Sequence, residues 1–362
     1  MKIMLVFGTR PEAIKMCPLV NELKKQADME TVVCVTGQHK EMVSPVLELF
    51  GVQPDYDLEI MKANQTLFSI TTSILEKIKP VLEEEQPDIV LVHGDTTTTY
   101  AAALAAFYLG IKVGHVEAGL RTYNLQSPFP EEFNRQSTSI IANYHFAPTE
   151  LAKENLLKEG RENVYVTGNT VIDALTTTVQ KDYTHPDLDL NVDTRLILLT
   201  AHRRENLGEP MKHMFRAVKR VLNEYDDVKV IYPIHKNPLV RETAAEIFGD
   251  TERIQIIEPL DVLDFHNFMN HSYMILTDSG GVQEEAPSLG KPVLVMRDTT
   301  ERPEGVAAGT LKLVGTDEET IYQNFKMLLN YFKTEYKKMS QASNPYGNGD
   351  ASKQIVRILR GI

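Results

Sequence analysis

The sequence has too few cysteines, too little positive charge and no apolar run long enough for several protein classes. Its 362 residues contain only two cysteines, too few for a disulfide framework or a structural zinc site. The formal net charge of −12 argues against a general nucleic-acid or membrane-surface binder, which needs a basic face. No apolar stretch approaches the roughly 18 residues of a membrane span. We therefore expect a cytoplasmic protein with free thiols that binds neither nucleic acid nor membrane.

Several short motifs of known chemistry are also absent. There is no G-x-x-x-x-G-K-[ST] loop, and no G-x-G-x-x-G follows the first expected strand, so neither an ATP site nor a dinucleotide redox cofactor is expected. The G-x-S-x-G elbow of hydrolases and the H-E-x-x-H zinc helix are missing as well. The sequence therefore predicts no cofactor and no metal.

What the sequence does contain is a recurring order of strand, short loop and helix. Most expected strands are continuous runs of Val, Ile and Leu, which is typical of parallel strands covered on both faces. The expected strands are 2–8, 31–36, 88–93, 112–117, 145–148, 164–167, 195–201, 228–234, 254–258, 273–278 and 292–296, and the clearest helices are 12–25, 67–84, 211–224 and 318–339. This alternation predicts an α/β protein with doubly wound sheets.

A polar, acidic stretch near residues 180–194 interrupts this alternation and marks a linker. We predict an N-terminal Rossmann-like domain over residues 1–172 and a C-terminal Rossmann-like domain over residues 173–352. The C-terminal helix, 353–362, is a candidate for completing the first domain. Two such domains facing each other would leave a central cleft.

Reactive side chains follow nearly every expected strand. In open α/β sheets, ligands bind outside the carboxyl ends of the strands. A single histidine or acid at such a place is more often structural, for example a helix cap. Together, however, the residues would point to one cleft edge. The segments are Gly8-Thr9-Arg10, Gly37-Gln38-His39, His93-Gly94-Asp95, His115-Val116-Glu117, His202-Arg203, His235-Lys236 and Asp278-Ser279-Gly280-Gly281.

The last of these segments, Asp278 to Gly281, is a small-residue turn that leads into an expected helix. Such a turn offers backbone N–H groups to a phosphate. With Arg10 and His202 expected in the same cleft, a diphosphate is the favoured ligand. The acidic pair Glu284 and Glu285, one turn later, could bind a ribose diol.

Seven longer segments resemble the non-hydrolysing UDP-N-acetylglucosamine 2-epimerases. They occur in a fixed order over essentially the whole chain: FGTRPEAIK (7–15), VHGDTTTT (92–99), HVEAGLRT (115–122), PEEFNR (130–135), HRREN (202–206), TDSGGVQEEAP (277–287) and RDTTERPE (297–304). The resemblance implies a fold like that of the two-domain (GT-B) glycosyltransferases, usually as a homodimer. It also implies interconversion of UDP-N-acetylglucosamine and UDP-N-acetylmannosamine without a redox cofactor, for cell-envelope polysaccharide or teichoic-acid linkage synthesis.

The resemblance also implies roles for individual residues. Catalysis falls to Asp95, Glu117, Glu131 and His202. Lys15 would lie on the sugar side of the site, Phe265 near uridine, and Glu285 at the ribose. The diphosphate would be held by Arg10, Ser279 and Gly280, with Gly281 in the same turn and with Arg135 and His235 as further binding residues.

The chemistry itself favours elimination, because the C2 proton of the sugar is not acidic in the absence of a neighbouring carbonyl. Removing that proton as UDP departs gives a 2-acetamidoglucal, and re-addition with protonation from the other face gives the epimer. Acid–base groups near both faces of C2 and donors that stabilise UDP are then required. Which carboxylate serves which face stays open.

Some bacterial members are similar in a further respect, a second UDP-N-acetylglucosamine that activates the enzyme. Gln38, His39 and His235 match that pattern, whereas Glu41 stands where a glutamine can occur and Asn64 where an arginine can. Three rival functions remain at this point: a hydrolysing epimerase that releases N-acetylmannosamine and UDP, a glycosyltransferase of the same architecture, and a catalytically silent UDP-sugar sensor.

Overall fold

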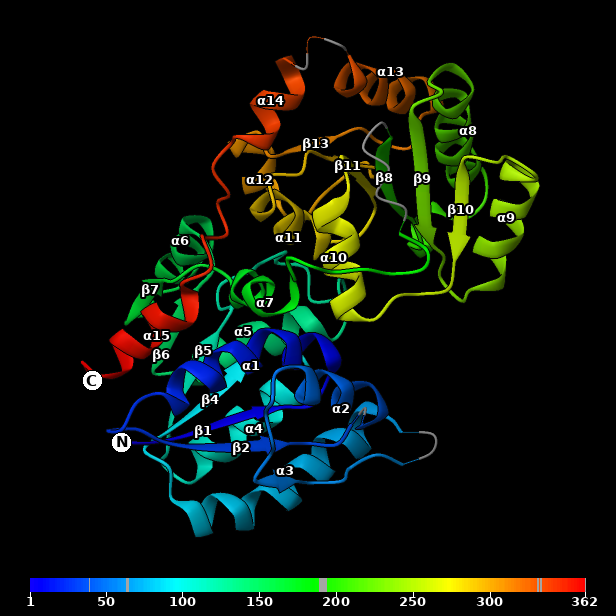
Figure 1. Cartoon of the computed structure of the whole chain (residues 1–362). Coiled ribbons are helices and arrows are strands. Elements are labelled where there is room, and N and C mark those ends of the chain that lie inside the picture. Colours follow the sequence, from blue (N-terminus) through cyan, green and yellow to red (C-terminus); the bar gives the residue numbers. More distant parts are fainter. Residues whose placement is uncertain (39, 63–64, 189–193, 331, 333, 362) are drawn as a thin grey trace. The chain divides into compact units, whose positions relative to one another are not determined.

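The computed structural model describes residues 1–38, 40–62, 65–188, 194–330, 332 and 334–361 (Figure 1). The chain divides into two compact units. Unit 1 comprises residues 1–177 together with 346–362, and unit 2 comprises residues 178–345. The chain therefore passes between the units twice, at residues 177/178 and 345/346. The folding domains predicted from the sequence, 1–172 and 173–352, stay a prediction.

Unit 1 is built on a parallel sheet of seven strands in the order β3-β2-β1-β4-β5-β6-β7. The strands are β1 (Lys2–Phe7), β2 (Glu30–Val35), β3 (Tyr56–Asp57), β4 (Ile89–His93), β5 (Lys112–Val116), β6 (Tyr144–Ala147) and β7 (Val164–Val166). The helices are α1 (Arg10–Lys24), α2 (Lys40–Leu49), α3 (Leu67–Glu85), α4 (Thr97–Tyr108), α5 (Glu131–Ile141), α6 (Glu150–Lys158), α7 (Thr170–Thr178) and α15 (Ala351–Leu359).

Unit 2 repeats the plan with six parallel strands in the order β10-β9-β8-β11-β12-β13. These are β8 (Arg195–Thr200), β9 (Val228–Pro233), β10 (Ile254–Ile257), β11 (Met274–Thr277), β12 (Val293–Val295) and β13 (Leu311–Leu313). Its helices are the 3-10 turn η1 (Arg204–Asn206), α8 (Glu209–Glu224), α9 (Pro238–Phe248), α10 (Val262–His271), α11 (Val282–Ser288), α12 (Pro303–Ala308), α13 (Glu318–Leu329) and α14 (Thr334–Ser340).

The central strands are apolar because helices cover both faces of each sheet. All five residues of β4 are buried, and so are five of the six in β1. On one face of unit 1, Val90 and Val92 pack against the alanine-rich helix α4 and the apolar side of α3. The eleven expected strands are all present, and the predicted α/β class with two doubly wound units is confirmed.

Each sheet reverses its strand order at one point. In unit 1 the reversal lies between β1 and β4, and in unit 2 between β8 and β11. The loops that leave neighbouring strands there diverge, which opens a crevice at the carboxyl edge of an open α/β sheet. Residues 8–10 and 94–95 follow the first pair of strands, and residues 201–203 and 278–281 follow the second.

The C-terminal helix α15 belongs to unit 1. Its first N–H groups, those of Ala351 and Ser352, donate to the carboxylate of Asp173 at 3.2 and 2.7 Å. Just before it, Tyr346 is buried against Val171 and Ile172 of α7. A buried acidic cap therefore holds the returning chain against α7.

The predicted helix 318–339 is wrong in one respect. Helix α13 ends at Leu329, where Asn330 adopts an extended conformation with φ −55° and ψ 139°, and α14 is a separate short helix. The short edge strands β3 and β13 were not expected, because two or three residues give too little periodicity to be recognised. Within the described residues, no helix is long and apolar enough to cross a membrane.

Candidate functional site

Glu117 lies at the carboxyl edge of unit 1, and its carboxylate has three other side chains close to it. It follows β5 with φ +59°, a left-handed conformation that costs a residue with a side chain about 1 kcal/mol. Its Oε2 pairs with Lys15 Nζ of α1, accepts a hydrogen bond from Asn169 Nδ2 at 2.8 Å, and lies 3.6 Å from His93 Nε2. Three different elements thus meet at one carboxylate oxygen.

The charge on Glu117 is stabilised by these neighbours. Burial on its own would raise the pKa of this carboxyl group, but Lys15 and His93 outweigh burial and hold the pKa well below its usual range. All the contacts described above are made by Oε2. Oε1 faces Gly94, where an added Cβ would lie 3.7 Å away. Glu117 is therefore an ionised carboxylate with one oxygen held and the other turned toward the β4 loop.

A buried carboxylate, Glu12, joins the loops after β1 and β4. Its Oε2 accepts hydrogen bonds from the backbone N–H groups of Gly8 and Thr9 at 3.0 and 2.8 Å. Its Oε1 accepts hydrogen bonds from the hydroxyls of Thr96 and Thr99 at 2.7 and 3.3 Å. Only Gly fits at position 8, since an added Cβ would stand 1.9 Å from Thr36 Oγ1. The two loops at the strand reversal are thus fixed to each other.

Asp95 lies in the β4 loop that Glu12 fixes, and α5 holds it from the other side. Its carboxylate forms an ion pair with Arg135, and its backbone carbonyl accepts a hydrogen bond from Asn134 Nδ2 at 2.9 Å. The same guanidinium lies 3.3 Å from the buried carboxylate of Glu132. Burial would raise the pKa of Glu132, but hydrogen bonds from Gln136 and from the loop at residues 122–123 lower it. Arg135 therefore forms ion pairs with two carboxylates, those of Asp95 and Glu132.

Glu131 and Arg10 occupy the first positions of their helices. Glu131 is the first residue of α5 and is half-buried. It lies on the same face of the helix as Arg135, one turn later. Arg10 starts α1 directly after Thr9 and is also half-buried. Across the residues that the structure describes, neither side chain makes a hydrogen bond or an ion pair. Both are therefore available to a ligand.

In unit 2 the corresponding position after β11 holds Asp278, which is fully buried. Its Oδ2 accepts hydrogen bonds from the backbone N–H groups of His202 and Arg203, both at 2.9 Å, and from Asn206 Nδ2 at 3.2 Å. One carboxylate therefore shapes the loop after β8. Its Oδ1 lies 3.6 Å from His202 Nδ1.

His202 is the partly exposed member of this cluster. Its ring is stacked against that of His235, with centroids 5.5 Å apart and an angle of 18° between the planes. Burial lowers the pKa of His202, and His235 and Arg203 act in the same direction, while Asp278 opposes them. The imidazole is therefore held near Arg203 largely in its neutral form.

The turn after β11 carries the predicted phosphate ligands. Ser279 N donates a hydrogen bond to Thr277 Oγ1 at 2.9 Å, whereas the N–H groups of Gly280 and Gly281 donate none within the described part of the chain. The Arg203 guanidinium lies beside Gly280, 3.6 Å from where a Cβ would stand. These free donors and one cation make the turn suited to an anion.

The predicted uridine and ribose residues lie close together in unit 2. Glu285 Oε2 on α11 lies 3.6 Å from Nε2 of His266 on α10. Phe265, the residue before His266, is half-buried and packs against the apolar core that α10 and α11 share with the sheet of unit 2. Glu285 also borders the turn, with Oε1 3.3 Å from an added Cβ at Gly281. The structure thus brings Glu285, His266 and the turn together.

The residues predicted for a second nucleotide sugar are only partly described. Gln38 Oε1 accepts a hydrogen bond from Thr98 Oγ1 at 3.3 Å, and Glu41 is exposed in the first turn of α2. His39 and Asn64 lie outside the described residues.

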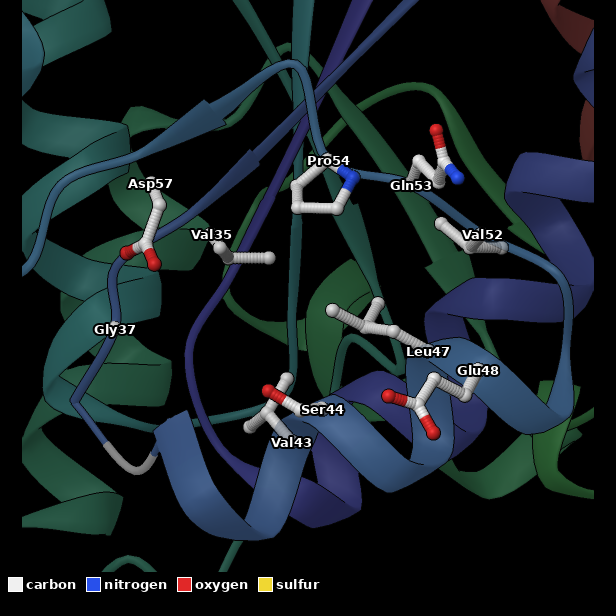
Figure 2. A pocket seen from close by; sticks show the side chains of 10 residues that line it. All are labelled: Val35, Gly37, Val43, Ser44, Leu47, Glu48, Val52, Gln53, Pro54 and Asp57. Carbon is white, nitrogen blue, oxygen red and sulfur yellow. The ribbon is translucent and has the colours of Figure 1, made fainter.

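A pocket of about 350 Å³ lies between α2, the loop that follows it and the edge of the sheet (Figure 2). Val35, Val43 and Leu47 line it, with Asp57 and Glu48 as its acidic residues. None of the predicted site residues lines this pocket, so it is distinct from the Glu117 cluster.

Sequence patterns place His93 and Asp278 in strand-end segments but give them no role of their own, and they assign no site role to Glu12 or Asn169. Glu12 lies in the first quoted motif, three residues after Thr9, which was the available signal. Asn169 stands outside the quoted motifs and was not signalled. Over the described residues, no group of three or more His, Cys, Asp or Glu side chains could hold a metal ion.

The comparisons with known proteins agree on one family. A family model described as UDP-N-acetylglucosamine 2-epimerase matches residues 21–360. UDP-N-acetylglucosamine 2-epimerase of Bacillus subtilis is 63% identical over 361 residues, covering 99% of this chain and 95% of that protein. The crystal structure of a putative UDP-N-acetylglucosamine 2-epimerase from Listeria monocytogenes has a TM-score of 0.95 at 56% identity, covering 99% of this chain and 96% of that one.

A second structure, UDP-GlcNAc 2-epimerase from Neisseria meningitidis bound to UDP-GlcNAc, has a TM-score of 0.90 at 51% identity, with 100% of each chain covered. The fold is thus of the class found in the two-domain GT-B glycosyltransferases, as predicted. Within that class, the chain belongs to the UDP-N-acetylglucosamine 2-epimerase family, a family of enzymes. The family resemblance noted in the sequence is confirmed.

Proposed function

We propose that this protein interconverts UDP-N-acetylglucosamine and UDP-N-acetylmannosamine by elimination and re-addition of UDP, without a redox cofactor. The observation that carries the proposal is the ionised Glu117 with one oxygen turned toward the loop of Asp95. Family membership and the UDP-GlcNAc-bound relative support the substrate. The product would supply N-acetylmannosamine units for cell-envelope polysaccharide or teichoic-acid linkages.

The proposed reaction has two steps, which balance in atoms and charge. A carboxylate takes the C2 proton while the C1–O bond breaks. The electron pair of the C2–H bond forms the double bond, and the electron pair of the C1–O bond leaves on the β-phosphate of UDP. The sugar becomes a 2-acetamidoglucal with a C1=C2 double bond. In the second step UDP re-adds at C1 as an acid delivers a proton to the opposite face of C2.

The electrostatics of unit 1 suit proton transfer by carboxylates. Against the effect of burial, Lys15 and His93 hold the pKa of Glu117 low, so Glu117 is ionised and can accept a proton. Arg135 forms an ion pair with Asp95 and fixes the position of its carboxylate. Glu131 makes no hydrogen bond or ion pair among the described residues, so its carboxyl group is available to contact the sugar. We assign proton removal and delivery to these three residues together.

Unit 2 fits the role of holding the departing UDP. Arg203, His202 and the N–H groups of Gly280 and Gly281 would face the negative charge that develops on the diphosphate. Arg10 of unit 1 is proposed to bind the same group and Lys15 to lie beside the sugar. Glu285 and Phe265 are placed at the ribose and the uracil.

The test is proton NMR of the purified protein with UDP-N-acetylglucosamine in D2O and no added cofactor. We expect deuterium at C2 together with UDP-N-acetylmannosamine. Free N-acetylmannosamine and UDP would instead show the hydrolysing reaction. An unchanged spectrum with detectable binding would contradict the proposal and favour a sensor or a transferase.

We also propose that a second UDP-N-acetylglucosamine binds at Gln38, His39, Glu41, Asn64 and His235. The exposed position of Glu41 near the N-terminus of α2 supports a surface site there. Because an arginine at position 64 would add a bidentate donor that asparagine cannot, we expect weak activation. A hyperbolic rate curve for the reverse reaction, unaffected by added UDP-N-acetylglucosamine, would exclude such a site.

A homodimer is proposed as the assembly. Helix α4 packs against both α3 and α5, and these helices carry large exposed apolar side chains. Phe68, Phe107, Tyr108 and Ile140 are between 58% and 85% exposed. Apolar groups gathered on adjacent helices are typical of an interface. Sedimentation velocity should give twice the chain mass, and a monomer would contradict the assignment.

A further inference from the structure

We propose that Asn169 is a positioning residue for Glu117. Its side-chain amide holds one carboxylate oxygen, and its backbone ties that carboxylate to the segment where the chain returns to unit 1. The kinetic part of this inference rests on the proposed function, whereas the structural part does not.

The contacts at Glu117 are one-sided. Lys15, Asn169 and His93 all approach Oε2, and among the described residues nothing donates a hydrogen bond to Oε1. Because only Oε2 has partners in the described part of the chain, these partners fix the rotation of the carboxylate. The direction of Oε1 therefore depends on the group that holds Oε2. The ammonium of Lys15 has a flexible stem and no preferred direction. The planar amide of Asn169 does have one.

The orientation of the Asn169 amide is itself determined. Its Oδ1 accepts a hydrogen bond from the backbone N–H of Val171 at 3.1 Å. Nδ2 must therefore be the atom that faces Glu117, at 2.8 Å. Asn169 is 2% exposed, so water does not compete for either contact. An amide donor also binds an ionised carboxylate more strongly than a neutral acid, and thus favours the charged state of Glu117.

The backbone of Asn169 extends this connection to the returning chain. Its N–H donates to the carbonyl of Tyr346 at 2.8 Å, in the first residue of the segment that re-enters unit 1. The approach is close at the neighbouring glycines. An added Cβ at Gly347, where φ is +107°, would lie 3.3 Å from Gly168 Cα. A displacement of the returning segment would therefore be transmitted to Glu117 through Asn169.

A purely structural role predicts a different outcome. In that case Asn169 would serve only as the turn that starts α7, through its bond to Val171. Its loss would then lower stability without changing the titration of Glu117. The two possibilities are separated by measuring the acid itself.

The experiment is a carbon-13 NMR titration of the Glu117 carboxyl group in the full-length protein labelled at glutamate Cδ. The Glu117→Gln variant assigns the signal. In Asn169→Ala we expect the acid dissociation constant of Glu117 to fall by about threefold to tenfold, because one hydrogen bond to the charged form is lost. In Asn169→Asp the fall should be larger, because a second carboxylate would face the first. A titration identical to that of the wild type in both variants would overturn the proposal.

Kinetics give a second readout. For Asn169→Ala we expect kcat for C2 proton exchange to fall about tenfold or more, KM to change less than twofold, and the acidic limb of the pH profile to move upward. The matched control is Asn155→Ala, which removes a side-chain amide bonded at 3.0 Å to the carbonyl of Gly119, two residues beyond Glu117. An equal effect in the control would contradict the assignment. A wild type without exchange would remove the proposed function, and the NMR titration would still decide the role of Asn169.

The connection to the returning segment is tested by Gly347→Ala. We expect a smaller shift of the Glu117 titration in the same direction as in Asn169→Ala. Gly160→Ala is the control, since Gly160 also has a positive φ, +72°, but an added Cβ would meet nothing within 4 Å. If Gly347→Ala titrates like Gly160→Ala, the link between the returning chain and Glu117 is absent.

Discussion

The two units share one topology but use their strand ends in opposite ways. At the carboxyl edge of unit 1, acids are paired with cationic side chains: Glu117, after β5, with Lys15, and Asp95, after β4, with Arg135. At the reversal in unit 2, Asp278 is satisfied largely by backbone N–H groups. In unit 1 each carboxylate is fixed by a cationic side chain from another element, whereas in unit 2 the carboxylate fixes the backbone of a neighbouring loop. The comparison shows that carboxylates at the strand ends of one fold can be held in two different ways.

The largest expected effect is on proton exchange, which is assigned to unit 1, with little change in UDP binding, which is assigned mainly to unit 2. Glu117→Gln should lower the rate of C2 proton exchange by at least about a hundredfold, because an amide cannot accept the proton. UDP affinity, assigned to unit 2, should change less than about twofold. Exchange by NMR and UDP binding by calorimetry give both values.

The control is Glu85→Gln, since Glu85 also pairs with a lysine, Lys2, in unit 1 but outside the cluster. A variant at position 117 that keeps a tenth of the wild-type rate would contradict the assignment.

The converse change is Asp278→Asn in unit 2. Loss of the charge weakens the hydrogen bonds that fix the loop of His202 and Arg203. We expect the free energy of unfolding to fall by about 1.5–3 kcal/mol and the Kd for UDP to rise about tenfold. Urea unfolding and calorimetry measure the two effects.

Asp317→Asn is the comparison, because Asp317 caps α13 at the surface of the same unit. UDP affinity equal to that of the wild type in Asp278→Asn would show that this loop does not hold the nucleotide.

A smaller effect concerns the pH dependence of stability in unit 1. Burial lowers the pKa of His115 to about 3, while its Nε2–H donates to the carbonyl of Gly94 at 2.7 Å. In the unfolded chain this pKa is about 6.5. Between these values the unfolded chain binds the extra proton, so the stability contributed by neutral His115 is lost as pH falls below 6.5. From pH 6.5 to 5 the loss is about 2 kcal/mol.

His115→Gln keeps a donor for Gly94 and removes the titration. Denaturant unfolding between pH 5 and 6.5 should therefore show a slope reduced by about one proton. Burial also lowers the pKa of His145, so some slope should remain in the variant. An unchanged slope would show that His115 is protonated in the folded protein.

The smallest expected effect is on thiol reactivity. Cys17 and Cys34 are fully buried in α1 and β2, and burial raises the pKa of each to about 12. Both should resist a disulfide reagent at pH 8 in the native protein and react on unfolding. Rapid labelling of either thiol in the native state would contradict this expectation.

Sequence patterns were sufficient for the fold class because the central strands are buried on both faces. Short continuous apolar runs rich in Val and Ile, such as residues 89–92, are consistent with a buried parallel strand when turn residues bound them. The edge strand β3 and the end of α13 at Leu329 were beyond such reasoning, since two residues carry no period and a cap depends on local backbone conformation. Family motifs named Asp95, Glu117, His202 and Ser279 directly.

By itself, then, the sequence determined two doubly wound units, the family, and which side chains stand at the strand ends. Tertiary structure alone decided which of them meet. Lys15 and Asn169 converge on one oxygen of Glu117 across 102 and 52 residues of sequence. Asp278 shapes a loop that begins 76 residues before it. Local periodicity reports which face of an element is buried, but partners so far apart are fixed only when the sheet closes and the loops meet at its carboxyl edge.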